Sequence, residues 1–205
     1  METLKFRILV VTVLFSGLLL NAQTAARQSA FSKSYELENA SNYASAIKEV
    51  KTVFDTDDYF CNIRLGWLYY LSKNYTESIK YYDKAISLKP YAIEARFGCI
   101  KPLSASENWE KVKAHYLQIL KIDPQNTTAN YWLGVIYYNR KQYSSAANLF
   151  GKVINLYPLD YDSVIMLAWT KLYLGKMGDA KVLFNHALTI RPNDVSAVAG
   201  LKLIK

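Results

Sequence analysis

The chain has 205 residues, of which 51% are hydrophobic and 20% are charged. Its 8 glycines and 5 prolines are too few for a disordered chain or for an all-β chain with many turns. The formal net charge is +8, but the basic side chains are spread along the chain without a dense cluster, so DNA or RNA binding is not expected.

The amino-terminal 22 residues have the pattern of a secretory signal peptide, in which two basic residues precede an uncharged apolar run, residues 8–20. This run is shorter than the ~20 apolar residues that a membrane-spanning helix needs. We therefore expect an exported protein that is cleaved after Ala22 or after Ala26. An uncleaved membrane anchor is the alternative.

Beyond the leader, the sequence repeats every 34 residues. Each repeat closes with a proline in a similar phrase: AISLKP at Pro90, ILKIDP at Pro124, VINLYP at Pro158 and ALTIRP at Pro192. Inside each unit, small and large apolar residues recur at spacings of three and four, which is typical of helices. The proline then ends the second helix. The pattern within each unit therefore predicts two antiparallel helices.

The period divides the chain into consecutive parts. After the leader we expect a degenerate unit over 23–58, full units over 59–92, 93–126, 127–160 and 161–194, and a short final helix over 195–205. Asp194 is suited to cap that last helix, which would cover the end of the stack. Pro102 falls inside the first helix of 93–126, where it predicts a kinked or shortened helix.

The repeat columns resemble the tetratricopeptide repeat (TPR). The best match is the unit 127–160, through Asn130, Leu133, Gly134, Tyr137, Ala146, Phe150 and Pro158. Units 59–92 and 161–194 are similar, whereas 93–126 departs most, since Ile100 replaces the small residue. The resemblance covers residues 27–205. It implies an all-α fold, a right-handed α-solenoid of TPR helical hairpins with a C-terminal capping helix.

The same resemblance implies that partner peptides lie against the first helices of the units. Counted from the glycine column, the inward side chains of this partner-binding groove are Ile63, Trp67, Tyr70, Phe97, Lys101, Tyr131, Val135, Tyr138, Ile165, Trp169 and Tyr173. Most are apolar or aromatic, and Lys101 is the one basic member, so a clamp for a C-terminal carboxylate is not expected. Packing between helices is the alternative role for these rings.

Candidate catalytic chemistry is sparse in the sequence. The histidines are His115 and His186, two units apart, and no catalytic or metal-binding motif accompanies them. Cys61 and Cys99 are interpreted as two separate buried thiols rather than a disulfide, because Cys99 falls in a core column. We therefore expect no enzyme, no metal and no cofactor.

The sequence thus favours an exported, non-enzymatic scaffold that binds a polypeptide segment in an aromatic groove, as part of a bacterial periplasmic or envelope assembly. The expected partner is a protein or peptide, and no nucleic acid is expected. The positive net charge would also allow peripheral association with the envelope. Binding of a glycan or cell-wall polymer to the same rings is the alternative function, because sugars also stack on aromatic side chains.

Overall fold

The structure is a computed structural model that describes residues 23–204, and the predicted leader, residues 1–22, lies outside them. Every regular element of residues 23–204 is a helix, with no β-strand among them, which confirms the predicted all-α class. None of these helices combines the length and the apolar character that crossing a bilayer would require. The chain divides into two compact units, here called unit 1, ending at Glu107, and unit 2, starting at Asn108.

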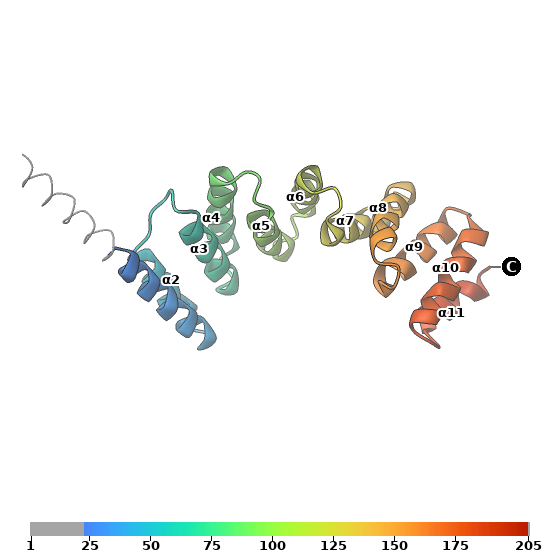
Figure 1. The fold of residues 1–205 in the computed structure, drawn as a ribbon, viewed down its shortest axis with the longest axis horizontal. Helices are drawn as coiled ribbons and strands as arrows, with labels where there is room; N and C mark the ends of the chain where they lie inside the picture. The colour runs from blue at the N-terminus through green and yellow to red at the C-terminus, as the bar shows by residue number, and fades with distance from the viewer. Residues whose placement is uncertain (1–22, 205) are drawn as a thin grey trace, which may run out of the picture. The chain divides into compact units, whose positions relative to one another are not determined.

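Unit 1 is a series of helices joined by short turns (Figure 1). Residues 23–39 are helical and precede α2. The helices that follow are α2 (Tyr43–Lys51), α3 (Tyr59–Leu71), α4 (Tyr75–Leu88) and α5 (Ile93–Ala105). Helix α3 packs against α4 and α5, so the first helices of successive hairpins are neighbours.

Unit 2 repeats this arrangement. Its helices are α6 (Trp109–Ile122), α7 (Thr127–Asn139), α8 (Tyr143–Leu156), α9 (Tyr161–Tyr173), α10 (Met177–Ile190) and α11 (Val195–Lys202). Helices α7 and α8 form one hairpin and α9 and α10 the next, while α11 packs against both α9 and α10. The predicted stacking of antiparallel helix pairs is therefore present in each unit.

In the hairpins, a glycine on one helix packs directly against an aromatic ring on the other helix. A methyl group added to Gly134 of α7 would lie 2.8 Å from the Phe150 ring of α8, and one added to Gly66 would lie 3.0 Å from the Tyr82 ring. Phe150 is fully buried, and the Ser78 hydroxyl donates to the Gly66 carbonyl at 2.7 Å. The small and large columns of the sequence therefore form the contact between paired helices.

The turns inside the hairpins share one backbone conformation. Each contains a residue with φ between 57° and 73°; these are Ser41, Lys73, Glu107, Lys141 and Gly175. In the α7–α8 turn, the Lys141 N–H donates to the Tyr138 carbonyl and the Gln142 N–H to the Tyr137 carbonyl, each at 2.9 Å. This is the Schellman ending of a helix, in which a left-handed residue satisfies the last free carbonyls.

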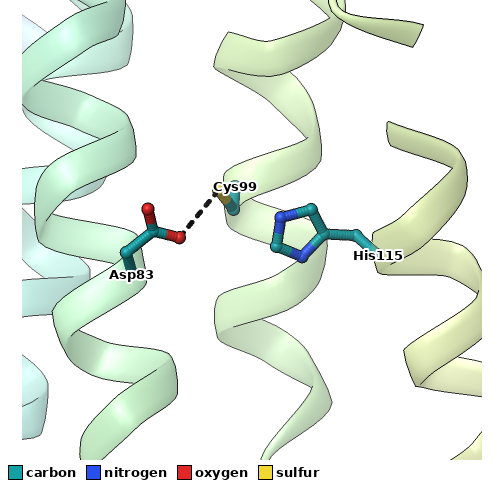
Figure 2. Close-up of side chains that lie close together, drawn as sticks. All are labelled: Asp83, Cys99 and His115. Carbon is teal, nitrogen blue, oxygen red and sulfur yellow. Dashed lines mark hydrogen bonds between the residues drawn. The ribbon is translucent and has the colours of Figure 1, made fainter. Parts of the chain in front are cut away.

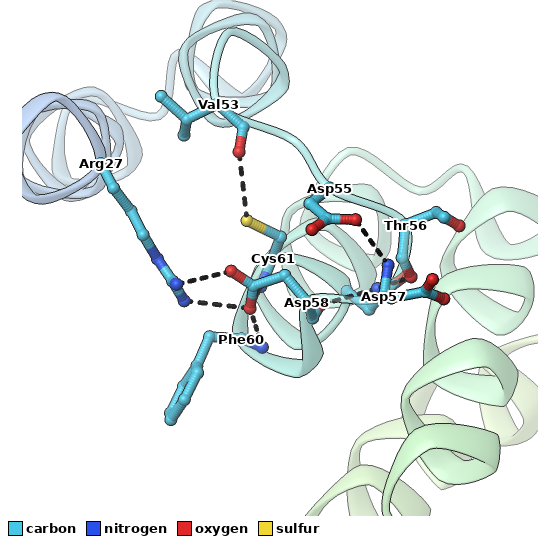
Figure 3. Close-up of polar contacts among 9 residues, drawn as sticks. Arg27, Val53, Asp55, Thr56, Asp57, Asp58, Phe60 and Cys61 are labelled. Atoms are coloured by element: carbon cyan, nitrogen blue, oxygen red, sulfur yellow. Dashed lines mark hydrogen bonds and ion pairs between the residues drawn. The ribbon is translucent and has the colours of Figure 1, made fainter. Parts of the chain in front are cut away.

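The start of α3 is held by a polar network at the amino-terminal end of unit 1 (Figure 3). Asp58 caps the helix by accepting from the backbone N–H of Phe60 at 2.8 Å and of Cys61 at 3.2 Å. Arg27 pairs with the same carboxylate at 2.7 Å and thereby ties the helix of residues 23–39 to α3. The predicted cap at Asp194, which accepts from the Ala197 N–H, is confirmed.

The shortening predicted at Pro102 is wrong. Helix α5 has 13 residues and contains Pro102, and α7 and α9 have 13 residues as well. Pro102 removes a single hydrogen bond, to the Gly98 carbonyl, and it lies in the last turn before the helix ends at Ala105. The side chain of Pro102 is buried in unit 1, so packing contacts are present at the place where the hydrogen bond is lost.

Candidate functional site

Three rings gather on α3 and α4, and we call them the unit 1 ring cluster: Trp67, Tyr70 and Tyr75. The Trp67 and Tyr70 ring centroids are 5.6 Å apart, and those of Tyr70 and Tyr75 are 6.1 Å apart. Lys101 extends from α5 with its Nζ 5.6 Å from the Trp67 ring, an attractive cation–π arrangement. All three rings are half-buried, so each keeps part of its surface open.

The unit 1 ring cluster rests on a buried ion pair. Arg64 is 4% exposed, donates to Glu38 and lies 3.8 Å from the Tyr35 ring. The same Glu38 carboxylate accepts from the Trp67 indole N–H at 2.7 Å, while Arg64 Nε donates to Ser34 Oγ at 3.0 Å. The helix of residues 23–39 thus orients Trp67 through hydrogen bonds.

The other predicted groove residues of unit 1 differ in exposure. Ile63 packs on the core around Tyr59, Ala85 and Ala95 and is half-buried, as is Phe97. Lys101 is exposed. The predicted groove members on α3 and α5 therefore include both packing residues and surface residues.

A larger cluster, the unit 2 ring cluster, joins α7, α8 and α9: Tyr138, Tyr143, Trp169 and Tyr173. Tyr143 and Tyr173 are stacked with centroids 5.1 Å apart and an interplanar angle of 14°. Tyr138 meets both at 5.6 and 5.9 Å, and Trp169 lies 6.2 Å from Tyr173. Burial raises the pKa of Tyr138 to about 12, and the adjacent Tyr173 adds to the shift.

The unit 2 ring cluster has a fixed inner side and an open outer side. Trp169 packs edge-on against Phe184 of the core at 5.2 Å and donates from its indole N–H to Ser196 Oγ at 2.8 Å. Tyr173, in contrast, is 54% exposed. The arrangement presents anchored rings to solvent, which limits the side-chain entropy lost on binding.

The remaining predicted residues of unit 2 lie closer to the core. Tyr131 and Val135 are half-buried and pack against the cluster around Phe150, while Ile165 is only 8% exposed. Ile165 therefore fills space between helices rather than forming a surface.

A pocket that the groove residues do not predict opens in unit 2, with a volume of about 340 Å³. We call it the acidic pocket, and its lining includes Thr127, Tyr131, Trp132, Tyr157, Asp160 and Asp162. Of these, Tyr131 alone belongs to the predicted groove. Trp132 lies inside α7, and the others come from the starts of α7 and α9 and from the turn after α8, where a helix-face pattern carries no signal. The proline phrase VINLYP, which differs from its neighbours by its tyrosine, is the one clue in the sequence.

Cys61 and Cys99 are buried and do not form a disulfide, in agreement with the favoured interpretation of two separate thiols. Cys61 Sγ donates to the Val53 carbonyl at 3.8 Å, and burial raises the pKa of its thiol. Cys99 Sγ donates to Asp83 at 3.9 Å (Figure 2). His115, drawn in the same figure, belongs to α6 of unit 2.

Comparison with known families decides the class of the chain. Models of the tetratricopeptide repeat match residues 59–92, 128–160 and 161–194. These segments contain the hairpins α3–α4, α7–α8 and α9–α10. This chain is a TPR protein. TPR repeats generally mediate protein–protein interactions, which supports a protein or peptide partner.

Solved TPR structures share the fold. A tetratricopeptide repeat protein from Parabacteroides merdae is 19% identical with a TM-score of 0.73, over 86% of this chain and 71% of the other. The MamA protein is 16% identical with a TM-score of 0.69, over 80% of this chain and 91% of the other. YrrB, described as a TPR protein with an unusual peptide-binding site, is 16% identical with a TM-score of 0.69, over 88% and 98%.

At these identities the structural likeness shows the TPR fold alone. No curated protein matches the sequence of this TPR protein. The TPR fold is typically a non-enzymatic interaction scaffold. Its specific binding surface therefore has to be argued from the ring clusters and the acidic pocket.

Proposed function

We propose that this TPR protein is an exported, non-enzymatic scaffold that holds an extended polypeptide segment against its ring clusters, in a bacterial periplasmic or envelope-associated assembly. The partner is a protein or peptide bound without a cofactor. The export part of the proposal rests on the residues of the leader, a basic start followed by an apolar run.

The observation that carries the proposal is the unit 2 ring cluster. Tyr138, Tyr143 and Tyr173 come from three different helices, yet their rings are in mutual contact and Tyr173 remains largely exposed. Aromatic rings that are held by packing on one side and exposed on the other are typical hot spots of protein interfaces. Each can contribute ~2 kcal/mol or more to the binding free energy. Such rings bind apolar side chains and peptide planes, which suits a polypeptide segment.

The cluster in unit 1 supports the same function. Trp67 and Tyr70 form an equivalent platform, and Glu38 fixes the orientation of the indole ring. Catalysis is not proposed, because the chain has just two histidines and neither ring cluster contains a nucleophile paired with a base.

A binding experiment with ring-deletion variants tests the proposal. We expect the double variant Tyr138→Ala/Tyr173→Ala to lose its native polypeptide partner in pull-down from the native envelope, with at least about a tenfold drop in recovery. The matched control is Tyr91→Ala, which removes a ring that is 83% exposed and lies in a turn of unit 1. Circular dichroism verifies that each variant is folded.

Two results would contradict the proposal. If the double variant retains every partner, the ring cluster is not the binding surface. If it keeps its protein partners but loses retention on polysaccharide, the rings bind a glycan. Sequencing the mature amino terminus tests export separately, since cleavage predicts Gln23 or Arg27 as the first residue.

A further inference from the structure

The acidic pocket of unit 2 combines exposed rings with two carboxylates. Trp132 is 48% exposed and Tyr157 is 59% exposed, and the Tyr131 ring meets Trp132 edge-on with centroids 5.2 Å apart. Asp160 and Asp162 flank these rings at the start of α9. Burial raises the pKa of Tyr131, and the charges of Asp162 and Asp160 add to the shift, so both carboxylates act on this ring.

The two carboxylates lack a cationic partner within the part of the chain that the structure describes. Asp160 accepts from the Ser163 N–H at 3.1 Å as a helix cap, and Asp162 is exposed. Elsewhere in unit 2, Glu110 pairs with Arg140 at 2.6 Å and Asp179 pairs with Lys171 at 2.8 Å. A chain of net charge +8 therefore supplies cations to other carboxylates of unit 2, but none of residues 23–204 forms an ion pair with these two.

The repeat register explains why a cation is missing here. In the segment 161–194, Arg191 lies over the Tyr161 ring at 3.7 Å, and in the segment 59–92, Lys89 lies over the Tyr59 ring at 4.7 Å. Both cations occupy the position just before the repeat proline. In the segment 127–160, that position is Tyr157. In two repeats a cation before the proline thus lies over the first tyrosine of the repeat, whereas the repeat 127–160 begins with Thr127 and has the exposed Tyr157 in place of that cation.

We propose that the acidic pocket binds a basic side chain, Lys or Arg, from the partner polypeptide. The cation would lie against the faces of Trp132 and Tyr157 with Asp162 and Asp160 beside it. A volume of about 340 Å³ is near the lower end of ligand pockets, ~300–1,000 Å³, and suits one long side chain. This inference rests on the proposed function, since it identifies a feature of the same polypeptide ligand.

The test uses the full chain and defined tripeptides. Acetyl-Ala-Arg-Ala-amide is titrated against the protein while NMR follows the indole N–H of Trp132. The neutral control is the same tripeptide with citrulline, which keeps the shape of arginine and removes its charge. We expect a saturable shift with the arginine peptide and at least about fivefold weaker association with the citrulline peptide.

Two charge variants assign the effect to the acidic pocket. Asp160→Asn/Asp162→Asn removes both pocket charges, and asparagine at position 160 still caps α9. We expect this variant to bind the arginine peptide about fivefold or more weakly. The matched control Glu110→Gln/Asp179→Asn removes the same number of charges outside the pocket and is expected to bind as the parent chain does.

Equal binding of the two tripeptides, or full affinity in Asp160→Asn/Asp162→Asn, would overturn the inference. A Trp132 shift with an N-acetylglucosamine tetramer and with neither peptide would also overturn it and assign the pocket to glycans. If the pocket variant keeps the native partner while Tyr138→Ala/Tyr173→Ala loses it, the inference alone fails. If the ring variant keeps the partner while the arginine peptide binds at Trp132, the proposed function alone fails.

Discussion

At the residue scale, the hairpin turns require a left-handed backbone that four residues with a Cβ atom adopt: Ser41, Lys73, Glu107 and Lys141. A side chain costs about 1–2 kcal/mol in this conformation, whereas glycine has no such penalty but loses more entropy on folding. The α9–α10 turn has Gly175 in the same place. The chain therefore carries a small, removable strain in four of the five described turns inside the hairpins.

This strain predicts a stabilising substitution. Lys141→Gly should raise the free energy of unfolding by about 0.5–1 kcal/mol, while Gly175→Ala should lower it by about 1 kcal/mol. Urea unfolding followed by circular dichroism measures both. Lys141→Ala is the control that removes the side chain and keeps the Cβ atom, and it should change little. A stabilising effect of Lys141→Ala equal to that of Lys141→Gly would show that the backbone is not the cause.

Glycines on the helices predict a second contrast. Gly134→Ala should destabilise the chain by about 1–3 kcal/mol, because the added methyl group would lie 2.8 Å from the Phe150 ring. Gly151 lies inside α8 with open space around it, so Gly151→Ala should stabilise by up to about 1 kcal/mol through helix propensity. Thermal unfolding compares the two variants. Loss of stability of similar size in both would contradict the close packing of α7 on α8.

At the scale of elements, the helix of residues 23–39 is attached to α3 by polar contacts as well as by apolar packing. Glu38 accepts from both Arg64 and Trp67, and Arg64 is almost completely buried. Because an unpaired buried charge is costly, Glu38→Ala should destabilise this attachment by about 2 kcal/mol. Hydrogen exchange of residues 23–39 is expected to accelerate.

The control for this prediction is Glu36→Ala on the exposed side of the same helix. Glu38→Gln, which keeps an acceptor for the Trp67 indole, should fall between the parent chain and Glu38→Ala. Unchanged exchange rates in Glu38→Ala would contradict the role of the Arg64–Glu38 pair as the link between the two helices.

The elements also show what a sequence with a 34-residue period can and cannot predict. The spacing of apolar residues by three and four marks the helices, and the proline phrase marks where the second helix of each pair ends. Together they predict the hairpins. The period does not show that Pro102 is accommodated, which depends on the place of the proline in the last helical turn. The pairing of Arg64 with Glu38 was also missed, since it depends on how two helices are rotated about their axes.

The partner-binding groove stays a prediction, and the structure shows how its residues are placed. Trp67, Tyr70, Tyr138 and Tyr173 form clusters that are partly exposed, whereas Ile165, another predicted groove residue, is buried. The difference in burial arises locally, because one part of a helix face contacts the next helix and another part contacts solvent. The acidic pocket is not predicted from the sequence because Tyr157 and Asp160 lie between helices, where the helical spacing of three and four does not apply.

At the scale of the whole molecule, buried tyrosines predict alkaline unfolding. Burial raises the pKa of Tyr116 and Tyr161 to about 12, and it also raises the pKa of Tyr82. A tyrosine in the unfolded chain ionises near pH 10. The unfolded state therefore releases these protons first, so stability is retained below pH ~10 and lost as the pH rises toward about 12.

This prediction is measured by raising the pH in steps and following helix content by circular dichroism and phenolate formation by absorbance at about 295 nm. We expect a group of tyrosines to ionise only as the helices unfold. Complete ionisation near pH 10 with all helix content retained would contradict the burial of these rings.

The central claim for the whole molecule is that the ring clusters hold a polypeptide. The most direct measurement replaces Tyr173, and separately Tyr70, by a photoreactive phenylalanine analogue in the native cell, with Tyr91 as the control position. The account predicts that both ring positions cross-link to a defined polypeptide segment and that position 91 does not. Equal labelling at all three positions, or adducts made only of polysaccharide, would contradict it.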